Sequence, residues 1–440
     1  MHQQILNTLS PPAAHPASYY AATSHAAPAR PPLEGSAECD VCVIGAGIAG
    51  CSAALHLAER GFKVILVEQH RVGWGASGRN GGQVMPGVAA GRARMARLIG
   101  AGGARTVWDV SIEGLDLVRQ LIAKHQIDCN WVSGQMYTAL KPRHDRELLE
   151  ELEELHEKYG YDSVRYLNRE EVRAVLGTER YISALYDSNA GHLHPLNYTL
   201  GLAAAAERAG AVIHEGTRAL RSAVLSGQPG APATVTTPHG NVRARYILLC
   251  GNAYLGDTAP SLASRIIGVS TYIVATQCLG AARARALIAN NAAVSDTNWV
   301  LDYFRLTADH RLLFGGRVNY SDLASFDAPA ATRKRMLRVF PQLADAAIDY
   351  YWGGYVDITL NRAPHFGRIA PNVYFLQGFS GQGVALAGIA GKLVAEAIDG
   401  TAGRFDVFAS IPHHAFPGGA LLRRPLLVLA MLYYRLKDLL

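Results

Sequence analysis

The sequence lacks any uncharged apolar run of about eighteen residues, the length that a membrane-spanning helix needs. It also lacks the charged start and apolar middle of a secretion signal. No dense Lys/Arg tract with interleaved aromatics occurs, and the net charge of +6 is spread over 440 residues. These absences predict a cytoplasmic protein with no transmembrane segment and no nucleic-acid partner.

Cysteine and metal-ligand patterns are sparse as well. The chain has six cysteines, most of them in apolar runs, and Cys39 and Cys42 lead directly into a hydrophobic strand. We therefore expect reduced thiols rather than a redox or zinc pair. His192 and His194 in "GHLHP" have no third ligand at a metal-binding spacing, so a structural or pocket-lining role is expected and no metal site is predicted.

The run "CDVCVIGAGIAGCSAALHLAERGFKVILVE" contains a nucleotide-binding signature. Gly45, Gly47 and Gly50 have the G-x-G-x-x-G spacing between a buried strand and a helix. The helix N-terminus would offer free N–H groups and a positive dipole end to phosphates. Glu68 ends the next strand, where its carboxylate would accept hydrogen bonds from ribose hydroxyls. The motif predicts a dinucleotide without a 2′-phosphate, either FAD or NAD.

A second glycine-rich stretch, "GWGASGRNGGQ" at residues 73–83, follows at once. Five of its eleven residues are glycine, which would let backbone N–H groups come close to a ligand. Ser77, Arg79, Asn80 and Gln83 add hydrogen-bond donors. Such a loop suits an extended cofactor whose flavin ring runs past the sheet edge, so it favours FAD over NAD. Whether Arg79 faces the phosphates or the substrate is left open.

A third block, "NVYFLQGFSGQGVALAGIAGKLVAEAI", again has a strand, a glycine-rich turn and a helix. Its helix N-terminus could favour negative charge on a reduced flavin. The three blocks would meet at one cofactor if the nucleotide domain is discontinuous. The expected cofactor contacts are Gly45, Gly47, Ile48, Ala49, Gly50, Glu68, Gln69, Ala76, Ser77, Arg79, Asn80, Gly81, Gln83, Ala219, Gly251, Gly378, Ser380, Gly381, Gln382, Gly383 and Val384.

The stretch "NWVLDYFRLTADHRLLFGGRVNY" predicts two or three antiparallel strands with a turn at "ADH". Tyr303 and Arg305 alternate onto one face of such a sheet. An Arg beside a Tyr on a sheet face can bind a carboxylate bidentately while the ring packs alongside. An exposed Arg on a surface sheet is the plainer alternative.

Together these elements predict an α/β fold (α+β overall). A discontinuous Rossmann-like FAD-binding domain would carry an inserted, mainly antiparallel β-sheet substrate domain with helices. The expected bounds are a flexible arm at 1–37, the FAD-binding domain at 38–110, 188–256 and 346–415, the substrate domain at 111–187 and 257–345, and a C-terminal helical tail at 416–440.

The same blocks, with "GHLHPLNYTLGLA", "LCGNAYL" and "NRAPHFGR", resemble the FAD-dependent D-amino-acid-oxidase-like (DAO) superfamily. Within it, the chain is most similar to the gamma-glutamylputrescine or gamma-glutamylpolyamine oxidase group, over about residues 18 to 440. The resemblance implies oxidation of a carbon–nitrogen bond, with an amine and molecular oxygen as substrates. It also implies catalytic roles for Tyr303, Arg305 and Gln382, and substrate contacts for Trp352 and Gln83.

Some relatives attach the flavin covalently through a His in the second glycine loop or a Cys near 350–360. This chain has Arg79 and Asn80 in the loop and no Cys in that range, so non-covalent FAD is expected. Gln382 stands where many relatives carry His. An oxidase or dehydrogenase of sarcosine, glycine or a D-amino acid stays an alternative, as do a dehydrogenase serving a quinone, a non-catalytic flavin-binding protein and, more remotely, an NAD-dependent dehydrogenase. The amine, the electron acceptor and the oligomeric state stay open at this stage.

Overall fold

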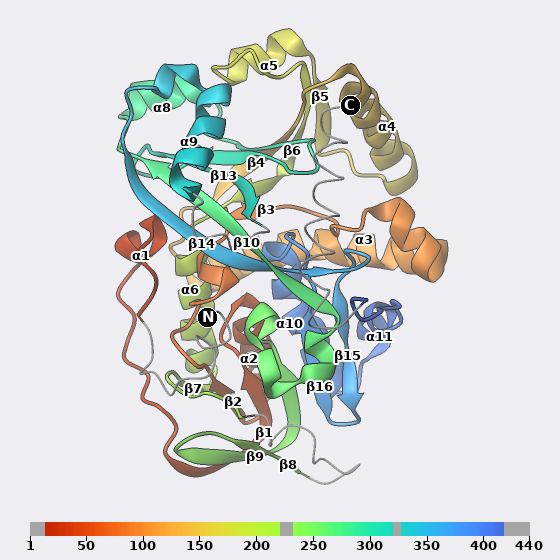
Figure 1. Ribbon diagram of the computed structural model, residues 1–440. Helices are drawn as coiled ribbons and strands as arrows, with labels where there is room; N and C mark the ends of the chain where they lie inside the picture. Colours follow the sequence, from red (N-terminus) through yellow and green to blue (C-terminus); the bar gives the residue numbers. More distant parts are fainter. Residues whose placement is uncertain (1–13, 221–231, 320–326, 418–440) are drawn as a thin grey trace.

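The computed structural model describes residues 14–220, 232–319 and 327–417. Two sheets organise them, and the expected mixed α/β fold class is confirmed. In Figure 1 the first sheet and its helices form the lower part of the molecule, and the second sheet forms the upper part. The long helix α3 (Arg92–His125), which bends at Gly100, crosses between them.

The first sheet is a doubly covered, largely parallel sheet. Its order is β15-β16-β9-β1-β2-β7, with β8 paired to β9; β8 and β15 run antiparallel to their neighbours. The central strands read as continuous apolar runs because both faces are buried. Its strands are β1 (Gly35–Ile44), β2 (Val64–Val67), β7 (Val212–His214), β8 (Ala233–Thr236), β9 (Gly240–Leu249), β15 (His365–Ala370) and β16 (Val373–Gln377).

Small residues let the helices of this part pack closely. Helix α10 (Val384–Ile398) lies against α2 (Ile48–Ala58), where a Cβ on Gly391 would come within 2.8 Å of the Ala49 carbonyl oxygen. The Ser52 hydroxyl donates to the Gly388 carbonyl oxygen at 2.7 Å. The other helices here are α6 (Pro195–Arg208) and α11 (Gly403–Ala409), which extend the same core.

The second sheet is mainly antiparallel, in the order β14-β10-β13-β12-β11-β4-β6-β3 with β5 beside β6. The predicted hairpin at residues 303–319 is confirmed, since β12 pairs antiparallel with β13. The strands are β3 (Gln83–Val84), β4 (Val132–Ala139), β5 (Val164–Leu167), β6 (Ser183–His192), β10 (Ile266–Thr276), β11 (Ala293–Asp296), β12 (Tyr303–Leu306), β13 (Leu312–Asn319) and β14 (Ile348–Thr359).

Short helices cover the far side of this sheet, at the upper end of Figure 1. They are α4 (Pro142–Glu153), α5 (Arg169–Val175), α8 (Ala281–Leu287) and α9 (Ala328–Val339), and α4 continues as one π-helical turn at Glu154–Lys158. Single turns occur at α7 (Pro260–Ala263), η1 (Ala76–Gly78), η4 (Asn252–Tyr254), η5 (Gly256–Thr258) and η6 (Pro341–Leu343).

Two segments differ from the expected domain division. Strand β14 falls in the range 346–415, which was expected to belong to the FAD-binding part, yet it pairs with β10 along its whole length. Residues 18–24 differ from a flexible arm, because helix α1 (Tyr19–Thr23) buries Tyr20 completely between the two parts. The first thirteen residues of that expected arm, and the expected tail beyond residue 417, lie outside the described residues.

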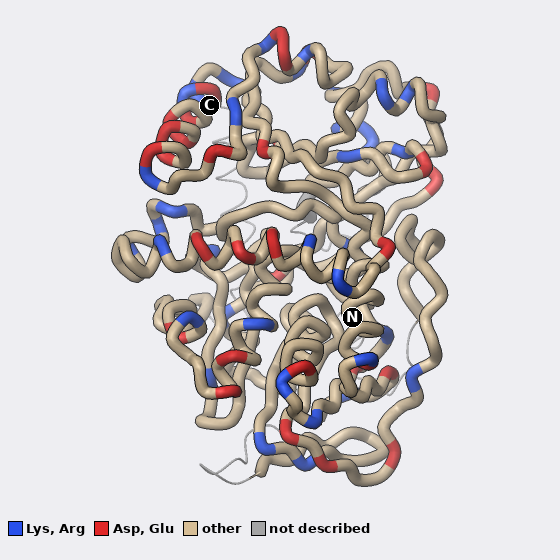
Figure 2. Tube along the Cα trace, turned by 180° about the vertical axis from the view of Figure 1, so that it is seen from behind, with Lys and Arg blue, Asp and Glu red and all other residues tan. Residues whose placement is uncertain are grey.

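Charges of both signs alternate over the trace in Figure 2, without a continuous basic tract in the part of the chain that is described. Within the described ranges, no helix combines the length and apolarity needed to cross a bilayer.

Candidate functional site

The first glycine loop is shaped by the protein's own backbone. A Cβ on Gly50 would lie 1.9 Å from the Gly45 carbonyl oxygen, and one on Gly45 would lie 2.8 Å from the Cys250 carbonyl oxygen. Gly47 ends the loop, and α2 begins at Ile48 with no side-chain cap. The loop therefore places the N-terminus of α2 beside the segment that starts at Gly251, and Gly47 itself brings no capping side chain there, which suits a phosphate site.

Glu68 closes the adjacent part of the site. Its carboxylate accepts backbone N–H bonds from Ala46 at 2.8 Å and from His70 at 2.9 Å. Burial raises the pKa of Glu68, and these two hydrogen bonds oppose the shift. The carboxylate is thereby held next to the first glycine loop, where the ribose of a dinucleotide was expected.

Ser77 joins the second glycine loop to the first. Its Oγ accepts the Ile48 backbone N–H at 3.0 Å, and a Cβ on Gly47 would lie 2.7 Å from the same oxygen. The hydroxyl proton of Ser77 has no acceptor among the described residues, so it can be donated to a ligand. Among the predicted cofactor contacts, Gly45, Gly47, Ile48, Gly50, Glu68 and Ser77 are therefore brought to one place.

The Asn80 side chain forms hydrogen bonds within the second glycine loop. Its Nδ2 donates to the carbonyl oxygens of Ala76 and Ser77 at 3.0 and 3.1 Å, and its Oδ1 accepts the Gly82 N–H at 2.8 Å. All of these bonds lie within the second glycine loop. The Asn80 side chain thus holds the shape of the loop and has no donor left for a cofactor.

Arg79 is a half-buried cation among aromatic rings. Its guanidinium lies 4.1 Å from the centre of the Trp74 ring, and its Nε donates to the Trp74 carbonyl oxygen at 2.7 Å. Nη1 approaches the Gly353 carbonyl oxygen on β14 at 3.5 Å, whereas Nη2 is buried without a hydrogen-bond partner among the described residues. Burial lowers the pKa of Arg79, and Tyr254 and Tyr355 oppose the shift. One donor nitrogen is thus available to an anionic or polar ligand atom.

The geometry revises the expected role of Arg305. Its Nε donates to the Gly81 carbonyl oxygen at 2.7 Å, and Nη1 donates to that of Leu306 at 3.0 Å. Nη2 donates to the Leu193 carbonyl oxygen at 2.9 Å and to the Tyr20 hydroxyl at 3.0 Å. Arg305 as a whole is 5% exposed. With four donors already used, it cannot offer a substrate the bidentate contact that the sequence suggested.

The neighbours of Arg305 also face the second glycine loop. Tyr303 packs its ring against Gly81, where a Cβ would lie 2.8 Å from the ring edge, and burial raises its pKa. Trp352 is 3% exposed and donates its Nε1 proton to the Arg79 carbonyl oxygen at 3.0 Å. The Gln83 amide turns to β11, donating to the Val294 carbonyl oxygen and to Ser295 Oγ, both at 3.1 Å.

The third block forms a turn in left-handed backbone conformations. Gly378, Ser380 and Gly381 have φ values of 79°, 51° and 95°. The turn leads into α10, which begins at Val384 without a side-chain cap. Gln382 Oε1 is buried and has no hydrogen-bond partner in the described part of the chain. The Phe379 N–H, three residues before Gln382, donates to Asp357 on β14 at 3.1 Å. The turn that carries Gln382 therefore lies next to β14.

Several groups around this region fit a large polar ligand. Tyr254 OH and Asn252 Oδ1 are also buried without hydrogen-bond partners within the described ranges. Buried polar atoms normally have partners, so such a group of orphaned atoms marks a place where ligand atoms belong. Sequence reasoning missed Trp74, Asn252, Tyr254 and Tyr355; the aromatic residues gave no periodic signal. Ala219 lies in an apolar cluster with the strand-end residues Ile44, Val67 and Leu249, and the cofactor contacts of Ala219 and Gln69 stay predictions.

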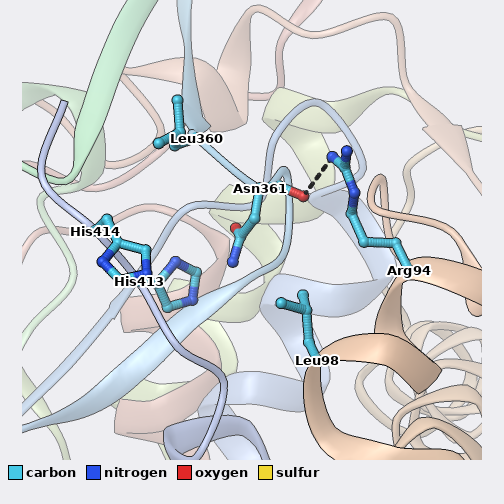
Figure 3. A pocket seen from close by; sticks show the side chains of 6 residues that line it. All are labelled: Arg94, Leu98, Leu360, Asn361, His413 and His414. Carbon is cyan, nitrogen blue, oxygen red and sulfur yellow. Dashed lines mark hydrogen bonds between the residues drawn. The ribbon is translucent and has the colours of Figure 1, made fainter. Parts of the chain in front are cut away.

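A surface hollow of about 240 Å³ opens elsewhere, at the start of α3 (Figure 3). Arg94 and Leu98 lie on one side of Asn361, and His413 and His414 lie on the other side. Leu360 lies at the rim of the hollow. The polar groups bond to one another's backbone: Asn361 Nδ2 donates to the Pro412 carbonyl oxygen at 2.8 Å. None of the expected site residues lines this hollow, so the glycine loops remain the candidate site.

Comparison with known proteins finds a family match and similar proteins over most of the chain. Residues 40–397 match the DAO family, described as "FAD dependent oxidoreductase". The chain is 42% identical over 427 residues to "Gamma-glutamylputrescine oxidoreductase" of Escherichia coli (strain K12), covering 96% of this chain and 98% of that protein. Among solved structures, glycine oxidase from Bacillus cereus ATCC 14579 superposes with a TM-score of 0.68 at 21% identity, over 86% of this chain and 99% of that one.

A second solved structure adds the same fold with its cofactor present. Dithionite-reduced L-alpha-glycerophosphate oxidase from Mycoplasma pneumoniae, with FAD bound, superposes with a TM-score of 0.63 at 18% identity. The superposition covers 87% of this chain and 97% of that one. At this level of identity, both solved structures speak for the fold alone.

Proposed function

Because the chain belongs to the DAO family of FAD-dependent oxidoreductases, we propose that it oxidises the carbon–nitrogen bond of an amine, as a flavin-dependent oxidase. The proposed substrate is a gamma-glutamyl-putrescine or gamma-glutamyl-polyamine, and the products are an aldehyde, ammonia and hydrogen peroxide, as a step of polyamine catabolism. The observation that carries this substrate class is the 42% identity over nearly the full length of both chains to a protein named for gamma-glutamylputrescine.

The residues of the first and second loops fit FAD. Glu68 would accept hydrogen bonds from the ribose, and the N–H groups at the start of α2 would receive the phosphates. Ser77 would donate its hydroxyl proton to the cofactor. No His lies within 73–83 and no Cys within 350–360, which supports non-covalent binding.

When bound, FAD accepts a hydride equivalent from the carbon that carries the amine. The chain's task is to bind the amine in its neutral form, which can push electrons toward that carbon. Half-buried aromatic walls such as Tyr303 and Tyr355 would lower the pKa of a bound ammonium group through desolvation. Water then hydrolyses the resulting imine to aldehyde and ammonia, and oxygen takes up the two electrons and two protons as peroxide.

Arg305 enters this proposal as a support. It holds the carbonyl oxygen of Gly81 and so places the second glycine loop, against which Tyr303 packs. Gln382 is proposed to face the flavin, where its Oε1 could accept a hydrogen bond. Trp352 donates its Nε1 proton to the Arg79 carbonyl oxygen and so holds the backbone at Arg79 in place. The substrate carboxylate therefore needs another cation, and Arg79 is the candidate whose free donor nitrogen suits it.

The test is a substrate screen on the purified protein. Gamma-glutamylputrescine should bleach the flavin absorbance under anaerobic conditions, and air should restore it with release of peroxide. Free putrescine, sarcosine, glycine and a D-amino acid serve as matched comparisons. Bleaching by an amino acid alone would favour the amino-acid oxidase alternative. Bleaching without peroxide would favour a dehydrogenase, and no bleaching by any amine would favour a non-catalytic flavoprotein.

A further inference from the structure

A buried carboxyl that no step of the proposed reaction uses lies where the cofactor loops meet. Asp357, on β14, is 2% exposed. Its Oδ2 accepts hydrogen bonds from the backbone N–H groups of Gly378 and of Phe379, the latter at 3.1 Å. The carboxyl also receives a hydrogen bond from the Asn252 side chain. One side chain thus joins β14, the turn after β16 and the segment after β9.

The turn that Asp357 holds is unfavourable without support. Ser380 adopts a left-handed φ of 51° although it carries a side chain. Such conformations persist only when the surrounding contacts fix them. Here the Ser380 N–H donates to the Asp357 carbonyl oxygen at 3.1 Å, and the Thr359 N–H donates to Ser380 Oγ at 3.3 Å. The end of β14 therefore determines the shape of the turn.

Both segments attached to Asp357 border the candidate cofactor site. The turn carries Gln382 and ends at the uncapped start of α10. The segment with Asn252 begins at Gly251, whose neighbour Cys250 lies against Gly45 of the first glycine loop. A shift of either segment would change the surface that receives the cofactor.

We infer that Asp357 is a positioning residue, whose carboxyl fixes the turn 378–383 and the segment 251–252 in the arrangement that binds the flavin. The inference rests on the proposed function for the identity of the cofactor. Burial raises the pKa of Asp357 to about 7, but either protonation form keeps an oxygen that accepts the two backbone bonds. A neutral amide of the same shape should therefore serve almost as well.

The test compares Asp357→Ala and Asp357→Asn with Asp187→Ala as the matched control. Asp187 is also 2% exposed, and its carboxylate also caps a turn, accepting the N–H groups of Asn189 and Ala190 at 2.9 and 3.3 Å. It lies on β6 and contacts none of the glycine loops. The readouts are the rate of FAD release from holoenzyme on dilution, the visible circular dichroism of the flavin, and the thermal unfolding midpoint.

We expect D357A holoenzyme to release FAD at least about tenfold faster, the effect typical of losing an outer hydrogen bond that orients a site. Its flavin circular dichroism should change as well. D357N should stay close to wild type on both readouts, because the amide keeps an oxygen that can accept the N–H groups of Gly378 and Phe379. D187A should lower the unfolding midpoint while leaving FAD release and the flavin spectrum unchanged.

Wild-type FAD release and an unchanged flavin spectrum in D357A would overturn the inference, whatever the loss of thermal stability. If D357A does not fold, Asn252→Ala is measured by the same readouts, and wild-type values there would overturn it equally. Neither readout uses an amine. A wild-type protein that holds FAD but oxidises no amine would therefore contradict the proposed function and leave this test valid.

Discussion

Arg305 shows how a buried cation is held without an acid. Its guanidinium donates to three carbonyl oxygens and to the Tyr20 hydroxyl. Lysine has one nitrogen and cannot reach acceptors in this fork geometry. We expect Arg305→Lys to lower the free energy of unfolding by about 2–4 kcal/mol, since carbonyl oxygens are left without donors. Thermal and denaturant unfolding measure this loss.

Arg105→Lys is the control, because Arg105 pairs with Asp109 at the surface and such pairs contribute about 1 kcal/mol or less. A raised KM for the amine with unchanged stability in Arg305→Lys would instead favour the carboxylate-binding role that the sequence suggested.

Sequence reasoning can predict the role of a single residue only when the residues that it contacts are close to it in the chain. The three glycines and Glu68 were predictable because the strand, turn and helix that use them are continuous in the chain. The acceptors of Arg305 at Gly81, Leu193 and Tyr20 lie 224, 112 and 285 positions away. Strand periodicity correctly put Tyr303 and Arg305 on one face, but it carries no information on what that face meets.

Among the elements, the segment from Ser18 to Leu33 works as a strap across both sheets. At one end the Tyr19 hydroxyl donates to Asp309 at 2.7 Å, beside the turn between β12 and β13. At the other, Arg30 forms a bidentate pair with Glu207 of α6 at 2.7 and 2.8 Å. In Figure 1 the segment runs down one edge of the molecule from α1 to β1.

Removing residues 1–24 should therefore lower the thermal unfolding midpoint strongly. The deletion takes out Tyr20, which is completely buried, and losing one such aromatic side chain costs about 3–5 kcal/mol. A deletion of residues 1–13 is the control, because it leaves the segment from Ser18 to Leu33 intact. If both deletions unfold at the wild-type temperature, the strap contributes nothing to stability.

The strap and β14 show that the composition and pattern of one segment do not predict which other segments it packs against. Ala, Pro and Ser dominate residues 1–37, so composition alone suggested a flexible arm. The two tyrosines are nevertheless ordered, because they pack in an apolar cluster with residues of α6, β10, β13 and β14. For β14, sequence reasoning placed the range 346–415 in the FAD-binding domain and predicted no partner strand. Its place in the second sheet follows from pairing with β10, far away in the sequence.

For the whole molecule, buried acids predict how stability depends on pH. Burial raises the pKa of Asp296 to about 7, and the charge of Asp302 adds to the shift. Hydrogen bonds from Asn298 and the charge of Arg335 oppose it. The folded protein then binds this proton more tightly than the unfolded chain does. The resulting stability is fully present below the ordinary pKa of 3.8 and is lost as the pH rises to about 7.

Other buried acids titrate in the same window, so only the difference between wild type and Asp296→Asn isolates this group. Between about pH 5 and 7, the free energy of unfolding should fall less steeply in D296N than in wild type. For one proton, the difference in slope is at most about 1.4 kcal/mol per pH unit. Denaturant unfolding at several pH values measures both slopes, with the exposed Asp109→Asn as the matched control. Parallel slopes in wild type and D296N would show that Asp296 stays ionised in the folded protein across this range.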